Sequence, residues 1–201
     1  NLLGEEQSGQ IRDVGYELYQ SMLEETISKI RGGKIDVLTS MDNQWSPQIN
    51  LGVSVLIPES YVADLDVRLG LYRRLSNLSK KVEFEGFAAE LIDRFGQLPP
   101  EVNTLLLVVR IKSVCKKAGI GKLDGGPRGA TIQFHNDKFI SPEGLVGFIK
   151  KQNGLAKIKD NKLIIKREWK KNSDRFKEAF SIARDLAEIA VSYQQNSSTK
   201  N

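Results

Sequence analysis

Cysteine and histidine, the side chains from which most zinc sites are built, are almost absent from this sequence. Among 201 residues there is one cysteine, Cys115, and one histidine, His135. A single cysteine forms no internal disulfide bond, which is typical of a protein in a reducing compartment. A zinc site needs several such ligands, and a Ser-His-Asp triad would have to be built around His135 alone. We therefore interpret His135 as a surface histidine at a strand end rather than as a catalytic residue.

The sequence also has no hydrophobic run that approaches the roughly 20 apolar residues of a membrane-spanning helix. We expect a cytoplasmic protein with no membrane partner. The chain does not open with methionine but with NLLGEEQSGQIRDVGYELY, in which a short loop bounded by Gly4 and Gly9 leads directly into a helical pattern. We expect the chain to be a piece of a larger protein.

Nucleotide-binding loops are lacking as well. The nearest match to a phosphate-binding loop is KKAGIGKL, residues 116–123. It has Lys116 where the first glycine of the motif would stand, and Leu123 where the magnesium-ligating serine or threonine would stand. GGPRG, residues 125–129, is better interpreted as a hairpin loop. These absences predict that the chain itself is not an enzyme and has no catalytic residues, no metal site and no cofactor.

What the sequence does have is a surplus of positive charge. Thirty lysines and arginines against 25 aspartates and glutamates give a formal net charge of +5. This charge is consistent with a nucleic-acid partner, or with a mildly basic surface that has no such role. In KIKDNKLIIKREWKK, residues 157–171, a predicted hairpin alternates lysine with apolar residues. The candidate nucleic-acid contacts are Lys157, Lys159, Lys162 and Lys166. These lysines would either contact phosphates or prevent an edge strand from pairing with another sheet.

The hydrophobic pattern predicts an α+β protein. Apolar residues at helical spacing predict an N-terminal helix from Ser8 to about Arg31, within a first region of residues 1–33. Residues 34–60 are expected to form a linker and an extended segment, in which Ile49 to Ile57 alternate as in a strand. Residues 61–193 are expected to form a compact domain of several helices with short antiparallel strands and hairpins, and residues 194–201 a disordered tail.

Capping residues and turn residues place the elements of the 61–193 domain. Asp64 is expected to cap its first helix, and Ser141 a later one that has Pro142 at its first position. Asp160-Asn161 predicts a hairpin turn. One helix is expected to begin at Asp64 and another at Ser141, and three more are expected at about 83–95, 100–117 and 173–193. The expected strands span 121–123, 130–134, 156–159 and 162–167.

One helix carries charges in a pattern that fits a docking surface. In AAELIDRFG, residues 88–96, Leu91, Ile92 and Phe95 can face the core. Glu90, Asp93 and Arg94 then point outward within about one helical turn. On the residues alone, these three charges form either a solvated helix face or a contact surface for a partner.

Three longer stretches resemble one protein family. NLLGEEQSGQIRDVGYELYQSMLEE, residues 1–25, resembles the end of the TRG motif shared by bacterial transcription-repair coupling factors (the Mfd family) and the related RecG helicases. PQINLGVSVLIPESYVADLDVRLGLYRRL, residues 47–75, and FAAELIDRFGQLPPEVNTLL, residues 87–106, are similar to the join with the C-terminal domain of Mfd and to that domain itself. The resemblance covers nearly the whole chain and discriminates Mfd from RecG.

The resemblance implies a function for the larger protein. Such a protein releases RNA polymerase stalled at DNA lesions by ATP-dependent translocation on double-stranded DNA, using ATP and magnesium in motor lobes upstream of this region. It recruits nucleotide excision repair by binding UvrA through a UvrB-like module. The C-terminal domain is implied to dock on that module in the resting state and to mask the UvrA-binding surface.

The resemblance also implies roles for individual residues. Gln7 matches the TRG-motif glutamine that helps to couple nucleotide state to DNA movement. Glu90, Asp93 and Arg94 match the exposed face expected to make the intramolecular docking contact. The alternative is a basic module that binds nucleic acid through the hairpin of residues 157–167.

Overall fold

The computed structural model describes residues 45–53 and 55–198, which form two compact units. One unit contains residues 55–109, and the other contains Trp45–Val53 together with the described residues from Arg110 onward. The predicted α+β class is confirmed. The boundary between the units lies between Val109 and Arg110, inside a helix. The sequence-based prediction was one compact domain over residues 61–193. The N-terminal helix predicted from Ser8, and Gln7 before it, lie outside the described residues.

The first unit is helical. Helix α3 (Leu65–Ser76) begins at Asp64, whose side chain accepts a hydrogen bond of 2.9 Å from the backbone N–H of Val67, as its capping position predicted. Helix α4 (Lys81–Phe95) ends at Gly96, which takes φ of +89°. Helix α5 (Pro100–Ala118) begins in this unit. The apolar core of the unit is formed by Val55, Ile57, Val62, Leu71, Tyr72, Leu75, Phe84, Phe87, Leu91, Val102, Leu105, Val108 and Val109.

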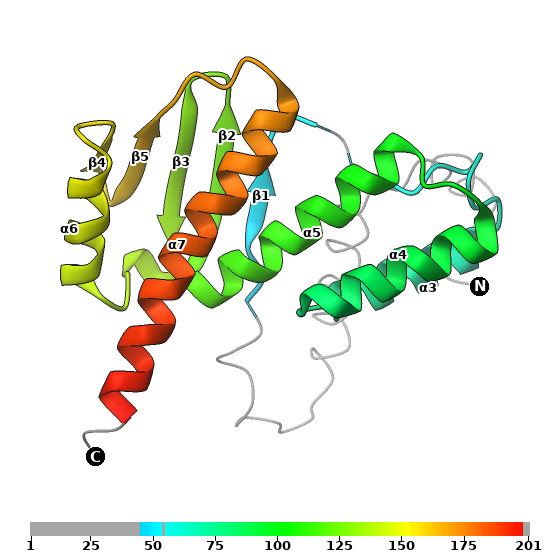
Figure 1. Cartoon of the computed structure of the whole chain (residues 1–201), viewed down its shortest axis with the longest axis horizontal. Helices are drawn as coiled ribbons and strands as arrows, with labels where there is room; N and C mark the ends of the chain where they lie inside the picture. Colours follow the sequence, from blue (N-terminus) through cyan, green and yellow to red (C-terminus); the bar gives the residue numbers. More distant parts are fainter. Residues whose placement is uncertain (1–44, 54, 199–201) are drawn as a thin grey trace, which may run out of the picture. The chain divides into compact units, whose positions relative to one another are not determined.

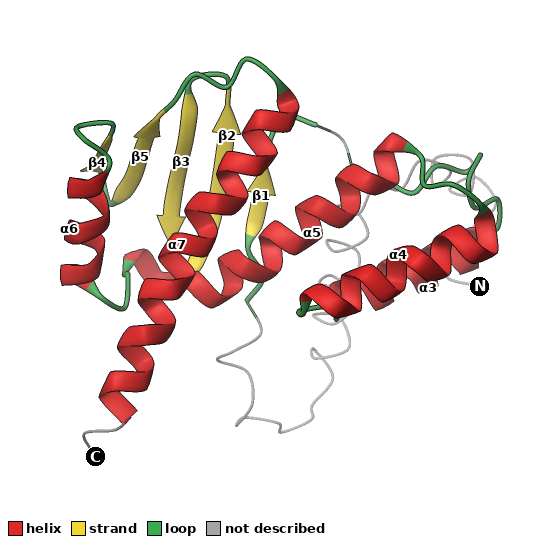
Figure 2. Ribbon diagram, in the orientation of Figure 1, coloured by secondary structure: helices red, strands yellow, loops and turns green. Residues whose placement is uncertain are grey.

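The second unit is built on a mixed five-stranded sheet in the order β1-β2-β3-β5-β4 (Figure 2). The strands are β1 (Gln48–Asn50), β2 (Ile120–Gly126), β3 (Gly129–Phe134), β4 (Ala156–Lys159) and β5 (Lys162–Lys166). Strand β1 pairs with β2 in parallel, and the other neighbouring strands are antiparallel. The order places β5 between β3 and β4, so β5 is an interior strand and β4 an edge strand.

Helices cover one face of this sheet. Helix α6 (Pro142–Lys151) and helix α7 (Asn172–Ser198) lie on the same side of it (Figure 1). The short 3-10 helix η2 (His135–Asp137) follows β3. Residues that alternate along the strands are buried toward the helices, and they include Leu123, Ala130, Ile132, Leu163 and Ile165. The opposite face carries mainly polar side chains. No helix of residues 45–53 and 55–198 lies against it (Figure 2).

Three boundaries differ from the sequence-based predictions. The alternating segment from Ile49 to Ile57 forms a strand only over Gln48–Asn50, because Gly52 turns the chain at φ +73° while Leu51, Val55 and Ile57 are buried without strand pairing. The β2–β3 hairpin is longer than predicted, and Pro127 and Arg128 form its turn. Helix α7 continues to Ser198, so the prediction of a disordered tail is wrong over residues 194–198. Once a helix has formed, each further residue adds one backbone hydrogen bond, which favours its extension.

Candidate functional site

Glu90 is the centre of a charged cluster on the first unit. It projects from α4 and accepts hydrogen bonds from two arginines. Arg94, one turn later on the same helix, donates through Nη1 to Oε1 at 3.0 Å. Arg74, from the last turn of α3, donates through Nη1 to Oε1 at 2.7 Å and through Nη2 to Oε2 at 2.5 Å. One carboxylate therefore holds two guanidinium groups from two helices, and we call this set the Arg74–Glu90–Arg94 cluster.

The cluster is charged and solvent-accessible. The two hydrogen bonds from Arg74, and then the one from Arg94, lower the pKa of Glu90 to about 2. The hydrogen bond with Glu90 likewise raises the pKa of Arg74. The side chains of Arg74, Glu90 and Arg94 are 49%, 34% and 45% exposed. At neutral pH the cluster thus presents two ordered guanidinium groups to solvent, and bidentate geometry of this kind favours specific recognition.

Aromatic rings support both arginines. The guanidinium carbon of Arg74 lies 5.1 Å from the ring centroid of Phe87, and that of Arg94 lies 4.8 Å from the ring centroid of Phe95. Stacking of this kind limits the freedom of long side chains. A partner would therefore meet guanidinium groups that are already positioned.

The structure brings together two of the three predicted docking residues. Glu90 and Arg94 are partners, whereas Asp93 is exposed and forms no ion pair with any residue in the described parts of the chain. Asp93 follows Ile92, whose side chain is 48% exposed. Arg74 is the residue that sequence reasoning missed. Its position in the Arg73-Arg74 pair at the end of a predicted helix was the only signal, and a basic pair does not identify its partner.

The four candidate nucleic-acid lysines lie in the second unit. Lys157 and Lys159 are on β4, Lys162 and Lys166 are on β5, and all four are exposed. In the register of the sheet Lys159 is opposite Lys162, and Lys157 is opposite Ile164. Residues at these alternate positions share one face, which is the face that no described helix covers. Asp160 and Asn161 join the two strands with φ of +51° and +58°, so the predicted hairpin turn is confirmed.

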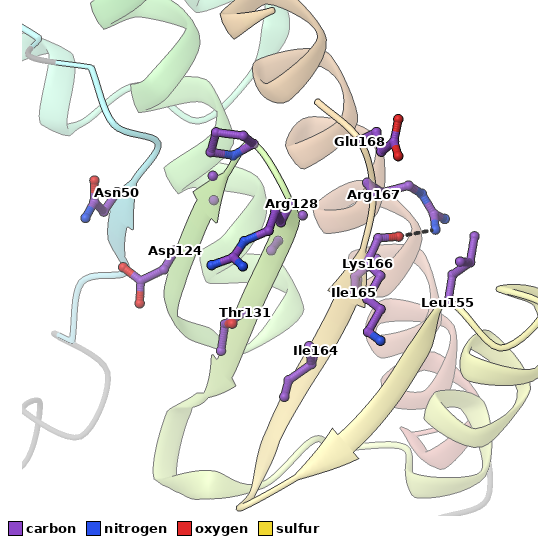
Figure 3. Close-up of a pocket in the computed structure, with 15 residues that line it drawn as sticks. Asn50, Asp124, Arg128, Thr131, Leu155, Ile164, Ile165, Lys166, Arg167 and Glu168 are labelled. Atoms are coloured by element: carbon purple, nitrogen blue, oxygen red, sulfur yellow. Dashed lines mark hydrogen bonds between the residues drawn. The ribbon is translucent and has the colours of Figure 1, made fainter. Parts of the chain in front are cut away.

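A shallow groove crosses one end of this open face (Figure 3). Its lining includes Arg128 from the β2–β3 turn, Thr131 from β3 and Ile164 and Lys166 from β5. Arg167 beside it donates a hydrogen bond of 2.9 Å to the carbonyl oxygen of Lys166. The lining carries three cationic side chains, Arg128, Lys166 and Arg167, and two carboxylates, Asp124 and Glu168, so its net charge is slightly positive. The two carboxylates lie on different sides of the groove (Figure 3) and do not face each other as an acid-base pair would.

The sequence motifs that resemble catalytic or nucleotide-binding groups have structural roles. Cys115 is fully buried in α5, and burial raises the pKa of its thiol to about 12. The His135 ring stacks on Trp45 with centroids 4.2 Å apart, and the Lys116 ammonium lies 4.0 Å from the Trp45 centroid. Gly119, between Lys116 and β2, takes φ of +71° where α5 ends. KKAGIGKL is therefore a helix end followed by a strand.

Within residues 45–53 and 55–198, no group of three or more histidine, cysteine, aspartate or glutamate side chains is arranged to hold a metal ion. No helix in these same ranges is long and apolar enough to cross a membrane.

This chain is similar to proteins described as transcription-repair-coupling factors. Residues 51–145 match the TRCF domain family. A transcription-repair-coupling factor from Rickettsia conorii is 48% identical over 165 residues, which cover 82% of this chain and 14% of the relative. One from Escherichia coli is 35% identical over 151 residues, which cover 75% of this chain and 13% of the relative. The chain thus spans about one seventh of the length of these curated relatives.

A solved structure has the same fold. The crystal structure of a C-terminal domain of transcription-repair coupling factor matches this chain with a TM-score of 0.62 and 21% sequence identity. The match covers 74% of this chain and 96% of that domain.

Proposed function

The chain belongs to the transcription-repair-coupling factor family and corresponds to its C-terminal region, and we propose that this region regulates the rest of the protein by an intramolecular contact. In the resting protein it docks on the UvrB-like module and masks the surface that binds UvrA. Engagement of the motor with stalled RNA polymerase releases the contact. The region acts as an autoinhibitory clamp and carries out no chemistry itself.

The proposal extends to the longer protein of which this chain is the C-terminal region. We propose that the whole protein is cytoplasmic, binds double-stranded DNA, and uses ATP and magnesium to translocate on it and displace stalled polymerase. The sequence supports the assignment of ATP hydrolysis to another part of that protein, since residues 116–123 of this chain lack both defining positions of a phosphate-binding loop. Gln7, in the segment that resembles the TRG motif, is proposed to couple nucleotide state to DNA movement.

The observation that carries the clamp proposal is the Arg74–Glu90–Arg94 cluster. A clamp that must open needs polar, reversible contacts, and exposed charges contribute more to specificity than to affinity. The cluster has charged groups in fixed positions, and Asp93 and the exposed Ile92 lie within one turn of it on α4. A difference of a few kcal/mol between the docked and released states is enough to switch their populations.

The test is binding of this chain to the isolated UvrB-like module, with UvrA as competitor. The Glu90→Ala/Asp93→Ala/Arg94→Ala variant and an Arg74→Ala variant are compared with the wild-type chain. We expect the triple substitution to weaken binding by about 10-fold or more, because about 1.4 kcal/mol corresponds to tenfold in the dissociation constant. UvrA should displace the wild-type chain.

A matched control lies on the same helix. Lys81 and Glu85 form an exposed ion pair of 3.4 Å at the start of α4. The Lys81→Ala/Glu85→Ala variant removes two charges from α4 and should bind as the wild type does. Measurements are repeated with the chain fused to the module by a flexible linker, which raises the effective concentration to the millimolar range. Lack of binding in both formats, or equal loss in the control, would contradict the clamp.

A further inference from the structure

The face of the sheet that is not covered by α6 or α7, or by any other helix in the described ranges, carries a concentration of positive charge. Its side chains come from alternate positions on all five strands. The charged ones are Lys122, Asp124, Lys157, Lys159, Lys162 and Lys166. Arg128 adds a further cation from the β2–β3 turn (Figure 3). We call this surface the basic sheet face.

Most of this charge is not compensated within the described parts of the chain. Asp124 is the one carboxylate at these strand positions, and it lies 3.4 Å from Lys122. Lys157, Lys159, Lys162 and Lys166 form no ion pair with any carboxylate in residues 45–53 and 55–198. The four exposed lysines are close together, since Lys159 is directly opposite Lys162. Like charges at directly opposed positions destabilise a sheet, so their clustering calls for an explanation.

Protection of a sheet edge explains only half of the cluster. Lysines on an edge strand discourage pairing with a strand of another molecule. That reason applies to Lys157 and Lys159 on β4. It does not apply to Lys162 and Lys166, because β5 is paired on both sides, with β3 and with β4. The interior lysines therefore point to a ligand that carries negative charge.

The composition of the face identifies the kind of ligand. Protein interfaces are enriched in aromatic residues and arginine and depleted of lysine, whereas this face has five lysines and no aromatic side chain at the strand positions described. Binding of single-stranded nucleic acid relies on aromatic side chains that stack on bases. A face of lysines without such rings matches the phosphates of a duplex, which bind without sequence readout.

We propose that the basic sheet face binds the phosphate backbone of double-stranded nucleic acid, independently of its sequence. From Lys162 to Lys166 the strand extends about 13 Å, and β2 to β4 spans about 14 Å across the sheet. A surface of about 13 Å faces roughly four phosphates of one DNA strand, since these are spaced about 3.4 Å along the helix axis. Lys157, Lys159, Lys162 and Lys166 make the main contacts. This inference does not rest on the clamp or on its docking residues.

The test measures binding of the whole 201-residue chain to a fluorescent 20-base-pair DNA duplex over a range of salt concentrations. The variant replaces Lys157, Lys159, Lys162 and Lys166 with glutamine. We expect the wild type to bind in low salt with a log-log salt slope of about −3 to −4, as about four phosphate contacts imply. The variant should lose about 100-fold or more in affinity, and its slope should approach zero.

A control variant with the same net charge separates position from total charge. It replaces Lys138, Lys150, Lys151 and Lys177 with glutamine, which are exposed and lie after η2, on α6 and on α7. The control should retain wild-type affinity to within about threefold, and far-UV circular dichroism should show that both variants are folded.

The remaining outcomes each overturn the proposal. Absence of duplex binding even in low salt would do so, as would equal losses in the two lysine variants. Tighter binding of single-stranded DNA of the same length would contradict the duplex assignment. Equally tight, lysine-dependent binding of polyglutamate would mean that the face recognises acidic polypeptide instead.

Discussion

Glu90 shows how one residue organises a surface. A carboxylate that accepts hydrogen bonds from Arg74 and Arg94 fixes two long side chains that would otherwise move freely in solvent. The negative charge of Glu90 is thereby paired with these two arginines. Removing Glu90 should therefore disorder both arginines as well as remove one negative charge, and Glu90 is better described as a positioning residue than as a direct docking contact.

Glu90→Gln should lower stability in a pH-dependent way. The pKa of Glu90 in the folded chain is about 2, below its ordinary value of 4.5. The ionised cluster therefore stabilises the folded state above pH 4.5, and this contribution is lost as the pH falls toward 2. Because the groups are exposed, we expect a loss of about 0.5–1 kcal/mol at pH 7, shrinking by more than half at pH 3. Urea unfolding of the wild type and the variant at pH 7 and pH 3 measures this difference in the free energy of unfolding.

Asp93→Asn is the control for this substitution. Asp93 forms no ion pair within the described parts of the chain, so the change should stay within about 0.5 kcal/mol. A pH-independent loss in Glu90→Gln would show that the carboxylate charge is not what stabilises the cluster.

Cys115 should be unreactive in the folded chain. Its side chain is fully buried and its pKa is raised to about 12, so the thiolate that attacks disulfide reagents hardly forms at pH 8. We expect reaction with a chromogenic disulfide to be about 100-fold or more slower than in guanidinium chloride, because reaction requires opening of the core. Equal rates in the two conditions would contradict the buried position.

At the scale of elements, two β-hairpins, β2–β3 and β4–β5, supply four of the strands in the sheet of the second unit. The β4–β5 turn uses two residues of positive φ, whereas the β2–β3 hairpin depends on Gly129, which takes φ of +123° where β3 begins. A Cβ at Gly129 would lie 2.0 Å from the carbonyl oxygen of Ile165 on β5. Glycine is therefore required here both by backbone conformation and by the close approach of β5.

Gly129→Ala should weaken the pairing of β3 with β5. The added methyl group must push apart two backbones that are paired in register, and we expect a loss of about 2–4 kcal/mol. Gly126→Ala, at the end of β2, is the matched control because a Cβ there meets no atom within 4 Å. Thermal unfolding of both variants measures the difference, and equal stability of the two would contradict the close approach.

For the molecule as a whole, distant parts of the chain must meet to complete the second unit. Strand β1 comes from residues 48–50 but pairs with β2, about 70 residues later. Arg175 on α7 donates a hydrogen bond of 2.7 Å from Nη1 to the carbonyl oxygen of Leu51, and both groups are buried. This contact ties the segment after β1 to the last helix.

Arg175→Met should destabilise the second unit. Methionine retains most of the apolar contact but leaves the buried carbonyl of Leu51 without its arginine donor, which costs about 1–3 kcal/mol. Arg184→Met, on the same helix and exposed, should change stability by less than about 0.5 kcal/mol. Denaturant unfolding followed by tryptophan fluorescence reports the change, because the buried Trp169 lies beside the same site. Equal effects of the two substitutions would contradict the role of Arg175.

The sequence by itself determined the elements whose signals are local. Asp64 and Ser141 cap helices as predicted, and the side-chain oxygen of each accepts a hydrogen bond from the backbone N–H three residues later. Asp160 and Asn161 form the predicted turn. Each of these interactions joins residues within a few positions of one another, so residue type and spacing suffice to identify it.

Only the tertiary structure decided which remote residues meet. Arg74 pairs with Glu90 because α3 and α4 belong to one core, β1 pairs with β2 from a distant part of the chain, and β5 is an interior strand because β3 pairs with its other side. Such contacts depend on the free energy of burying many apolar side chains together, which no short window of sequence contains. Local chemistry thus specified the helices, the turns and the lysine alternation of the β4–β5 hairpin, and packing of the chain brought Arg74 to Glu90 and set the hairpin beside β3.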